Sequence, residues 1–369
     1  MPLAATVAGL LAGLLIGPVG LAWQPAVHLQ GVFDTGGTMP DGRLVVAGSK
    51  GLYLLDSGGR TVPYAPAYRG QGGGEAYTAV ARGGGGGSGC PFEAGDVFVL
   101  DLGKPAGVLR IDRDQQVHRF ASISGVDSLD GIAFDTGGRF GGRLLVTGPR
   151  GRSTVVAALD CRARETRITE SAPVLEGGLS VAPAGFGSFG GDLIAPDELS
   201  GRLVAVGPDG GSSLVAVSGL PAGQDTGVEG VGFVPPGFAA GGKAYFADRA
   251  TGGSANPGSD TLLWLSASRL VAAGVRAGDL LAATEGGARL VDVRCARTCQ
   301  VRTLLGAGSP AHGEGHLVLV AAHPGPAPAA LPQAINPKPA PFPWLPVAAG
   351  AVVAIALLVG AGLVLRRRL

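Results

Sequence analysis

Two cysteines and two histidines near the end of the chain have the spacing of zinc ligands. In "CARTCQVRTLLGAGSPAHGEGH" they follow the order C-x3-C-x12-H-x3-H. The four residues are Cys295, Cys299, His312 and His316. Zinc fingers with such ligands place both histidines on a helix. Gly313 and Gly315 lie between the histidines here, and glycine disfavours a helix. We therefore predict that the spacing is a coincidence and that no four-ligand zinc site forms.

Part of the same stretch suits a different metal site. Residues two apart on a β-strand face the same side. An extended strand would therefore align His312, Glu314 and His316. Three such ligands can hold a divalent ion with an open coordination position. The alternative is a polar loop leading into the strand-like run "HLVLV", and we favour the loop.

Acidic residues precede glycine at the start of several apolar runs. These residues are Asp130, Glu176, Glu229 and Glu314. If the runs are the innermost strands of a ring of sheets, their first residues converge at one mouth of a central channel. Several carboxylates there would bind Ca²⁺ or another hard divalent cation. Acid–glycine pairs also mark turns that bind nothing, and this explanation stays open.

The elements that would position these carboxylates are short strands. Six apolar runs each follow a glycine and a polar residue, at intervals of 36 to 53 residues. The glycines are Gly42, Gly95, Gly142, Gly191, Gly242 and Gly278. After a turn, each run is followed by a second apolar run, and often by a third. Three to four short antiparallel strands, repeated about every 40 to 50 residues, are typical of a β-propeller blade.

Close sequence copies support this repeat. "FDTGGTMPDGRLVVAG" (33–48) and "FDTGGRFGGRLLVTG" (134–148) are nearly the same, and weaker copies occupy 181–197 and 233–248. A β-sandwich does not require copies at this period. A ring of blades buries the faces of each sheet and protects most of its edges. The sequence therefore predicts an all-β fold, a six-bladed β-propeller, with seven blades as the alternative.

One glycine-rich stretch interrupts the second unit. Residues 70–89, "GQGGGEAYTAVARGGGGGSG", include a polyglycine tract that offers no side chains for packing. Glycine-rich sequence forms flexible connections. We predict a loop over this whole stretch.

The ends of the chain predict where the propeller resides. Residues 344–365 carry no charge, and three arginines follow in the tail at 366–369. About 20 apolar residues cross a bilayer as a helix, and a basic flank stays in the cytoplasm. We expect a single-pass transmembrane helix in the cell membrane, with an extracytoplasmic body and a cytoplasmic C-terminus. The apolar run "LAATVAGLLAGLLIG" predicts that residues 1–26 are a signal peptide or an N-terminal anchor.

The body between these ends spans residues 27–325, and a Pro/Ala-rich spacer covers 326–343. Proline-rich sequence is extended and semi-rigid, so the spacer would hold the body away from the membrane. The formal net charge is +1, and only 15% of the residues are charged. Without a basic stripe, electrostatic binding of nucleic acid has no support.

The four cysteines of this exported body favour disulfide bonds over metal thiolates. Cys295 and Cys299 flank three residues between two strand-like runs, which predicts a hairpin closed by a local bridge. Cys90 and Cys161 would form the other pair, although four cysteines allow three pairings.

Units such as "DGIAFDTGGRFGGRLLVTG" resemble those of six-bladed propellers of the SMP-30/gluconolactonase and NHL-like superfamily. The resemblance covers most of the body. In the lactonase branch, a Glu, an Asn and an Asp from different blades hold a divalent metal. The resemblance implies Glu176 or Glu229, together with Asp130, as the acidic ligands. The chain has only Asn256 and Asn336, and neither stands at the start of a predicted blade.

These observations predict a membrane-anchored extracytoplasmic β-propeller that binds a protein, a glycan or a small ligand. Its partners would be the membrane, through the C-terminal helix, and an extracytoplasmic ligand or protein. The stretch "GFGSFGG" lacks the strand–turn–helix context of a nucleophile elbow, so nucleophilic catalysis has no support. The alternative is a metal-dependent hydrolase of lactones or esters of the SMP-30 type, with Ca²⁺ or another divalent cation as its cofactor.

Overall fold

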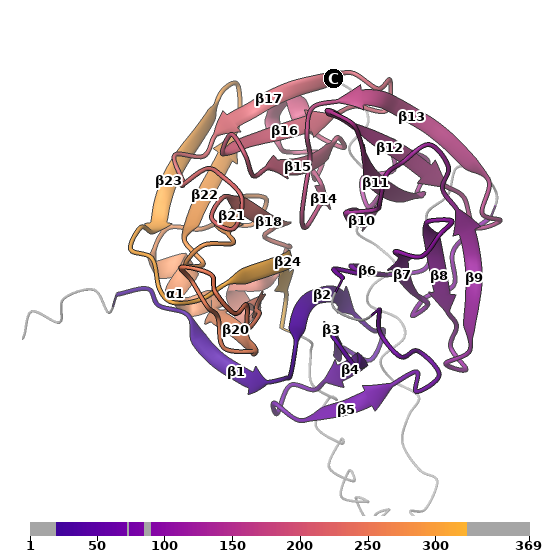
Figure 1. Ribbon diagram of the computed structural model, residues 1–369. Coiled ribbons are helices and arrows are strands. Elements are labelled where there is room, and N and C mark those ends of the chain that lie inside the picture. Colours follow the sequence, from indigo (N-terminus) through magenta and orange to yellow (C-terminus); the bar gives the residue numbers. More distant parts are fainter. Residues whose placement is uncertain (1–19, 72–73, 85–89, 323–369) are drawn as a thin grey trace, which may run out of the picture. The chain divides into compact units, whose positions relative to one another are not determined.

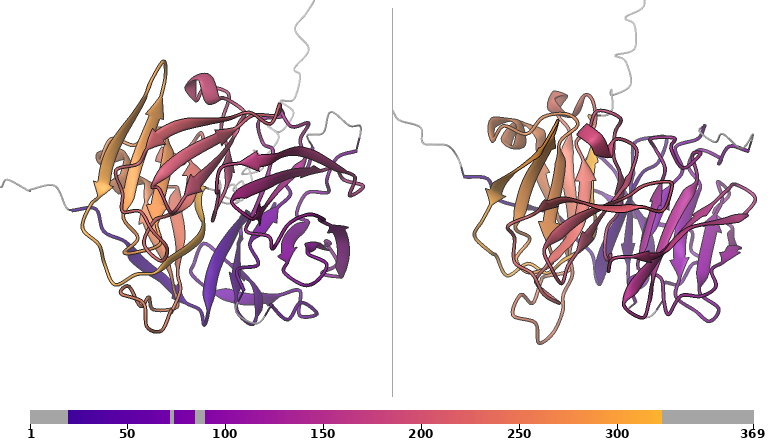
Figure 2. Two further views of the ribbon diagram at one scale, coloured as in Figure 1. Left: turned by 45° about the horizontal axis from the view of Figure 1, so that its top comes forward. Right: turned by 90° about the horizontal axis from the view of Figure 1, so that it is seen from above.

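The computed structural model describes residues 20–71, 74–84 and 90–322. In this part of the chain, 24 strands form six four-stranded antiparallel sheets. The sheets stand around a central channel as the blades of a propeller (Figure 1). Seen from the side, many of the strands run between the two ends of the channel (Figure 2). The prediction of an all-β fold with six blades is confirmed.

The first four blades follow the chain in order. Each begins with its innermost strand, beside the channel, and adds three strands outward. Blade one holds β2 (Val32–Thr38), β3 (Leu44–Gly48), β4 (Gly51–Leu55) and β5 (Thr61–Tyr64). Blade two holds β6 (Thr78–Val80), β7 (Val97–Asp101), β8 (Gly107–Ile111) and β9 (Val117–Ser122). Blade three holds β10 (Gly131–Phe134), β11 (Leu144–Arg150), β12 (Ser153–Leu159) and β13 (Glu165–Ala172), and blade four holds β14 (Ser180–Val181), β15 (Leu193–Asp197), β16 (Arg202–Val206) and β17 (Ser212–Val217).

The last two blades exchange strands along the chain. Blade five has the order β18-β21-β22-β23, and blade six has the order β24-β19-β20-β1 from the channel outward. Blade five holds β18 (Val228–Phe233), β21 (Leu280–Thr284), β22 (Leu290–Cys295) and β23 (Cys299–Leu305). Blade six holds β24 (Gly313–Val320), β19 (Lys243–Asp248), β20 (Thr261–Ser266) and β1 (Gln24–His28). The first and last strands of the described chain therefore share one sheet and close the ring.

This exchange differs from the predicted order of units. Along the sequence, the apolar run that begins after Glu229 comes directly before the run that follows Gly242, which predicts that both belong to one blade. In the structure, that run is β18, and it pairs with β21, the strand that follows Gly278. Glycines allow β18 to lie directly against β24, because a Cβ on Gly232 would lie 1.9 Å from the carbonyl oxygen of Leu317.

Apolar side chains fill the spaces between neighbouring blades. The largest group packs Phe98, Ile111 and Leu144, all fully buried, between blades one to three. Two disulfide bonds add covalent links, Cys90–Cys161 between the second and third units and Cys295–Cys299 between β22 and β23. Both predicted pairings are confirmed, and the four cysteines include no free thiol.

The predicted loop over residues 70–89 is wrong in its centre. Thr78–Val80 forms β6, the innermost strand of blade two, and Tyr77 just before it is buried. Its antiparallel partner β7 lies beyond the polyglycine tract. The glycines on both sides obscured a strand that is only three residues long.

The two closest sequence copies occupy different positions in their blades. In blade one Thr38 pairs with Leu44, whereas in blade three Phe134 pairs with Leu144. The "FDTGG" of the first copy therefore lies inside β2, and that of the second lies at the end of β10 and in the following loop. Two register shifts in β2 accommodate the difference. The two copies are nearly identical in sequence, but they do not occupy equivalent positions in their blades.

The predicted boundary between residues 26 and 27 falls inside β1. Leu21 and Trp23 also pack against the core between blades five and six, and the Trp23 indole N–H donates to the carbonyl of Ala288. The propeller thus includes residues that the sequence assigned to the N-terminal segment. The predicted spacer, transmembrane helix and basic tail, residues 326–369, lie outside the described residues.

Helices are few and short in the described ranges. They are η1 (Gly187–Phe189), η2 (Phe238–Ala240) and α1 (Ala267–Ala272). None of these helices has the length and apolar character needed to cross a membrane.

Candidate functional site

Acidic side chains from four blades meet at one end of the channel. The innermost strands begin at this end, and the neighbouring strands of the same sheets end there, because the pairing is antiparallel. Carboxylates that precede an innermost strand therefore lie close to those that follow the second strand of the same sheet. They are Glu75, Glu176, Glu198, Glu229, Glu285 and Glu314, and His312 and Arg249 lie among them. We call this end of the channel the acidic mouth.

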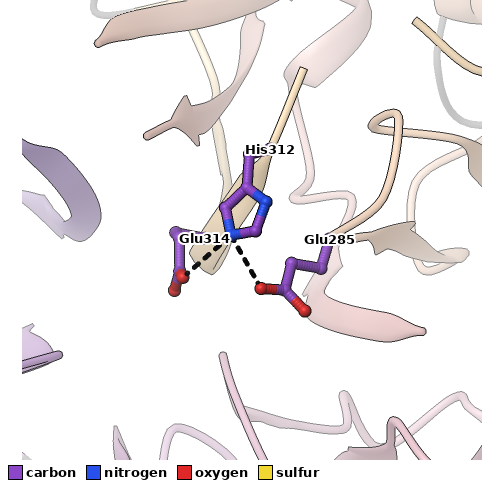
Figure 3. A group of neighbouring side chains, drawn as sticks. All are labelled: Glu285, His312 and Glu314. Atoms are coloured by element: carbon purple, nitrogen blue, oxygen red, sulfur yellow. Dashed lines mark ion pairs between the residues drawn. The ribbon is translucent and has the colours of Figure 1, made fainter. Parts of the chain in front are cut away.

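His312, Glu285 and Glu314 form the most compact group in the acidic mouth (Figure 3). The Nε2 atom of His312 lies 2.8 Å from Glu285 Oε1 and 3.7 Å from Glu314 Oε1. One ligand atom from each of the three side chains lies within 4.8 Å of the others. His312 is 2% exposed and Glu314 is 4% exposed, so the group is enclosed by protein.

The other ring nitrogen of His312 has its own partner. Nδ1 lies 3.1 Å from the backbone carbonyl oxygen of Asn256, and a carbonyl can only accept, so Nδ1 carries a hydrogen. Histidines that bind metals usually donate their second N–H to a carbonyl or carboxylate in this way. The contact orients Nε2 toward the two carboxylates.

Tyr77 connects two carboxyl groups behind this cluster. Its hydroxyl lies 2.9 Å from Glu229 Oε1 and 3.2 Å from Glu314 Oε2. One hydroxyl proton cannot serve both oxygens at once. The backbone N–H of Gly315 also donates to Glu229 Oε1, at 3.1 Å.

Arg249 and Glu75 lie at the solvent side of the acidic mouth. Arg249 Nη1 is 2.7 Å from Glu75 Oε1 and 3.4 Å from Glu314 Oε1. The Glu75 side chain is 47% exposed, unlike the buried glutamates below it. Arg249 therefore links the exposed rim of the mouth to its buried floor.

Burial and crowding shift the pKa values of these groups. Burial, and then the neighbouring charge of Glu314, raise the pKa of Glu229 well above its usual range. Burial also raises the pKa of Glu314, to about 7, against the opposing hydrogen bond from His312. Burial alone would lower the pKa of His312, but the hydrogen bonds and charges of Glu285 and Glu314 outweigh it and raise that pKa to about 10. Without a bound cation, His312 is therefore an imidazolium and Glu229 is a neutral acid.

The structure brings some of the predicted carboxylates closer together than others. Glu229 and Glu314 share the Tyr77 hydroxyl, and Glu176 lies near Glu198. Asp130 instead accepts a hydrogen bond from the Thr147 hydroxyl, at 3.0 Å within its own blade. Its half-buried carboxyl has a pKa raised to about 7, first by burial and then by the charge of Glu176. Whether any of the four binds a cation stays a prediction.

The glycines that follow these acids allow close approach between strands. A Cβ on Gly177 would lie 2.7 Å from the carboxyl carbon of Glu229, and its φ is +72°. A Cβ on Gly230 would lie 2.4 Å from the carbonyl oxygen of Gly315. Gly178 and Gly230 also form a parallel bridge between blades four and five. For the Gly177 and Gly230 pairs, close approach is a more direct explanation than turn formation.

His316 does not join the cluster around His312. Its Nδ1 lies 2.8 Å from Asp34 Oδ1, and its Nε2 lies 2.8 Å from the carbonyl oxygen of Ile132. The alternative in which His312, Glu314 and His316 share one face is therefore wrong. The favoured polar loop is also wrong, because Gly313–Val320 forms β24. A register shift in β24 breaks the alternation, and Gly315 within it has a φ of +66°. The disulfide Cys295–Cys299 also occupies the two sulfurs of the supposed zinc motif.

The sequence did not reveal five residues of the acidic mouth, one of which is Arg249, just after β19. Glu75 and Tyr77 were hidden in the glycine-rich stretch before β6. Glu198 and Glu285 follow β15 and β21, the second strands of their sheets, whereas only the starts of innermost strands were considered. The pair Glu285-Gly286 carries the same acid–glycine pattern and could have been found on that basis.

Two cavities lie at the opposite end of the channel. One of about 460 Å³ is lined by Met39, Lys243 and the end of β24 with Ala321 and Ala322. The other, of about 290 Å³, is lined mainly by apolar side chains, with His316 among them. β24 thus runs from the acidic mouth to a less polar mouth, where the described chain ends.

Comparisons with known proteins found similar solved structures at low sequence identity. No family model and no curated protein matches this sequence. A streptogramin B lyase structure covers 80% of this chain and 90% of its own, at 10% identity and a TM-score of 0.42. A catalytically inactive virginiamycin B lyase from Staphylococcus aureus, with quinupristin, covers 80% and 92%, at 12% identity and a TM-score of 0.43. A gluconolactonase from Xanthomonas campestris covers 62% and 69%, at 14% identity and a TM-score of 0.37. These similarities concern the fold alone.

Proposed function

We propose that the acidic mouth binds a divalent cation through Glu285, His312 and Glu314, and that the propeller uses this cation to hold an extracytoplasmic ligand. The observation that carries the proposal is the arrangement of one imidazole nitrogen and two carboxylate oxygens within 4.8 Å of one another. Three protein ligands leave coordination positions for an oxygen of the ligand or for water. When bound, the cation would supply positive charge that attracts an anionic or carbonyl oxygen.

The charge balance of the mouth supports a cation. Six glutamates converge there with one arginine and one histidine. Buried charges are costly unless they are paired or coordinate a metal. A divalent cation would replace the proton on His312 Nε2 and compensate part of the excess negative charge. Affinity should therefore increase as the pH rises and that proton is lost more easily.

The first test is the metal content of the full chain, purified in detergent without a chelator. We expect at least one equivalent of a divalent cation, measured by mass spectrometry. His312→Ala should lose it, whereas His118→Ala, which removes an exposed histidine on β9, should retain it. If the wild type and the His312→Ala variant hold the same amount of metal, the proposed site is wrong.

We further propose that the propeller is tethered to the membrane through the predicted C-terminal span. The support is the sequence alone, in which residues 344–365 carry no charge and arginines follow them. Fractionation of cells that make the full chain, or the chain ending at residue 330, tests the tether. Release of only the shorter chain is expected, and retention of both in the membrane would contradict it.

A second candidate function is hydrolysis of a lactone or ester. It is favoured by the neutral acid Glu229 and the Tyr77 hydroxyl beside Glu314, which could donate protons to a leaving oxygen. A panel of lactones and aryl esters, with the metal-loaded protein, tests this candidate. Turnover that His312→Ala abolishes would establish the hydrolase, and metal binding without turnover would leave the binding function.

A further inference from the structure

The cavity of about 290 Å³ at the opposite mouth lies apart from the proposed cation site. Its lining includes residues from the innermost strands of all six blades, β2, β6, β10, β14, β18 and β24, so it is the end of the central channel itself. No aspartate or glutamate is among the described residues that line it. Sites for small molecules are typically concave and mostly apolar, with a few polar groups that orient the ligand. This cavity has that character and lacks the negative charge of the acidic mouth.

We propose that this cavity binds a small apolar carboxylate, with the hydrocarbon part of the ligand in the channel and its carboxylate at Arg82. The site goes beyond the proposed function and does not depend on the cation at the acidic mouth. A water molecule in the liquid occupies roughly 30 Å³, so the cavity has room for about ten non-hydrogen atoms.

The wall of the cavity is apolar and is supported by packing behind it. Phe134 and Phe233 are half-buried and line the cavity from blades three and five. The Phe134 ring centroid lies 5.0 Å from that of Phe92, and the Phe233 centroid lies 4.8 Å from that of Phe186, both edge-to-face. A wall that is already ordered reduces the entropy cost of binding a hydrocarbon body.

The polar groups at the inner end of the cavity already have partners. His316 contacts Asp34 through Nδ1 and the carbonyl oxygen of Ile132 through Nε2. The Thr78 hydroxyl donates to Asp34 at 2.9 Å, and the Thr35 hydroxyl donates to the carbonyl oxygen of His316 at 3.2 Å. Burial of a polar group is costly when the group loses its hydrogen bond. A hydrocarbon group placed here leaves these hydrogen bonds intact, so the inner end suits the apolar part of the ligand.

The rim of the cavity carries polar groups without partners. Thr38, Arg82 and Thr136 line the cavity where the innermost strands of three successive blades end. Arg82 is exposed and forms no ion pair with any described residue, and all aspartates and glutamates of the chain are described. Neither threonine hydroxyl has a hydrogen-bond partner in the described ranges. A guanidinium group binds a carboxylate through paired, charge-assisted hydrogen bonds, and hydroxyls add further donors.

The neighbouring cavity of about 460 Å³ extends the positive charge of this mouth. It shares Arg82 with the first cavity and adds Lys243, whose ammonium lies 5.0 Å from the centroid of the Trp264 ring. Asp56, the one acid among the described residues of its lining, is paired with Arg60 at 3.3 Å. The charge at this end of the channel is therefore opposite to that of the acidic mouth, and it favours an anionic ligand.

The test is equilibrium dialysis of the full chain against hydrocinnamate, a phenyl ring on a short carboxylate chain, with the same detergent in both compartments. Hydrocinnamyl alcohol is the matched ligand, because it has the same body and a neutral head group. Arg82→Gln removes the charge at the rim, and Val318→Phe fills space at a position that lines both cavities. Arg152→Gln, at an exposed turn of blade three, is the control.

We expect Arg82→Gln to weaken the binding of hydrocinnamate by roughly tenfold or more, and that of the alcohol by less than about twofold. Only the carboxylate forms charge-assisted hydrogen bonds with the guanidinium group. Val318→Phe should abolish the binding of both ligands, and Arg152→Gln should match the wild type. Removal of divalent cations with a chelator should change neither affinity, which separates this site from the acidic mouth.

Four results would overturn the proposal. They are no binding of hydrocinnamate to the wild type, an unchanged hydrocinnamate affinity in Arg82→Gln, an equal loss for the acid and the alcohol in that variant, and loss of binding in chelator-treated protein. The last result would assign the carboxylate to a cation at the acidic mouth. If Val318→Phe fails to fold, Arg82→Gln decides alone, because its side chain is exposed.

Discussion

His312 and His316 lie four residues apart on one strand, both buried and both beside carboxylates, yet their surroundings differ. His316 has one carboxylate partner, Asp34, and one carbonyl partner, and each ring nitrogen makes one hydrogen bond. His312 faces two glutamates through a single nitrogen, and further glutamates lie behind them. One histidine belongs to a charge-balanced contact, and the other to a group with excess negative charge. The comparison indicates that a fully satisfied network stabilises the ring, whereas an unbalanced one is available to a cation.

The satisfied network connects four blades across the channel. Asp34 in blade one accepts the side chain and backbone N–H of His316 from blade six, and the backbone N–H and hydroxyl of Thr78 from blade two. His316 in turn donates to Ile132 in blade three. Among these contacts, the Asp34 carboxylate meets no second acid, and its one cationic partner is His316. We therefore assign Asp34 a structural role.

The largest effect is expected from Asp34→Asn, which breaks the balanced network. Removing one partner of a buried ion pair typically costs about 3–5 kcal/mol, because the other charge is left buried and unpaired. His316 would be left in that state, so the free energy of unfolding, measured by urea denaturation, should fall by this amount. Asp114→Asn, at an exposed turn, is the matched control and should change little. A loss below 1 kcal/mol would contradict the structural role of this network.

His312 and His316 face different partners because the backbone turns at Gly315, which lies between them. The variant Gly315→Ala tests this dependence. A Cβ there would lie 2.6 Å from Asp34 Oδ1, in a left-handed backbone conformation. We expect a loss of roughly 2–4 kcal/mol in the free energy of unfolding, from backbone strain plus displacement of Asp34. Gly151→Ala has a similar φ of +61° with nothing within 4 Å of the new Cβ, so it isolates the strain alone. If both variants lost the same free energy of unfolding, the close contact between residue 315 and Asp34 would contribute nothing.

Asp130 and Asp34 should affect the pH dependence of stability in opposite ways, because their pKa values are shifted in opposite directions. Burial raises the pKa of Asp130 to about 7, from an ordinary value of 3.8. Its contribution to stability is therefore fully present below pH 3.8 and is lost as the pH rises to about 7. Burial acts in the same direction on Asp34, but the charge and hydrogen bonds of His316 outweigh it and lower the pKa. The contribution of Asp34 is present above pH 3.8 and is lost as the pH falls through the lowered value.

Asp130→Asn should remove its part of this pH dependence. Between pH 4 and pH 7, the free energy of unfolding of the wild type should fall by roughly 2 kcal/mol more than that of the variant. This is about half of what the full pKa shift implies, because the Asp130 side chain is only half-buried. Urea denaturation at several pH values, on chelator-treated protein, measures the difference. Parallel stability curves for the two proteins would show that Asp130 titrates as it does in the unfolded chain.

The sequence predicted the ring better than it predicted the acidic mouth. Alternating apolar runs and turn glycines identified six blades because each blade repeats the same local pattern. The exchange between blades five and six was not predictable, since β18 and β19 have the same alternation whichever sheet they join. The start of an innermost strand correctly indicated Glu229 and Glu314 as neighbours. Glu198 and Glu285 come close to them only through the pairing of second strands, which is long-range information.

The smallest effect is expected from Glu75→Gln, at the exposed rim of the acidic mouth. Its ion pair with Arg249 is solvated, and pairs of this kind contribute about 0.2–1 kcal/mol to stability. A unit charge about 4 Å away contributes about 1 kcal/mol in water, so divalent-cation affinity should fall no more than about fivefold. Dialysis against Mn²⁺, with His312→Ala alongside, measures the contrast. If Glu75→Gln lost as much affinity as His312→Ala, the cation would reside at the rim with Arg249 displaced, and the buried histidine would be only its neighbour.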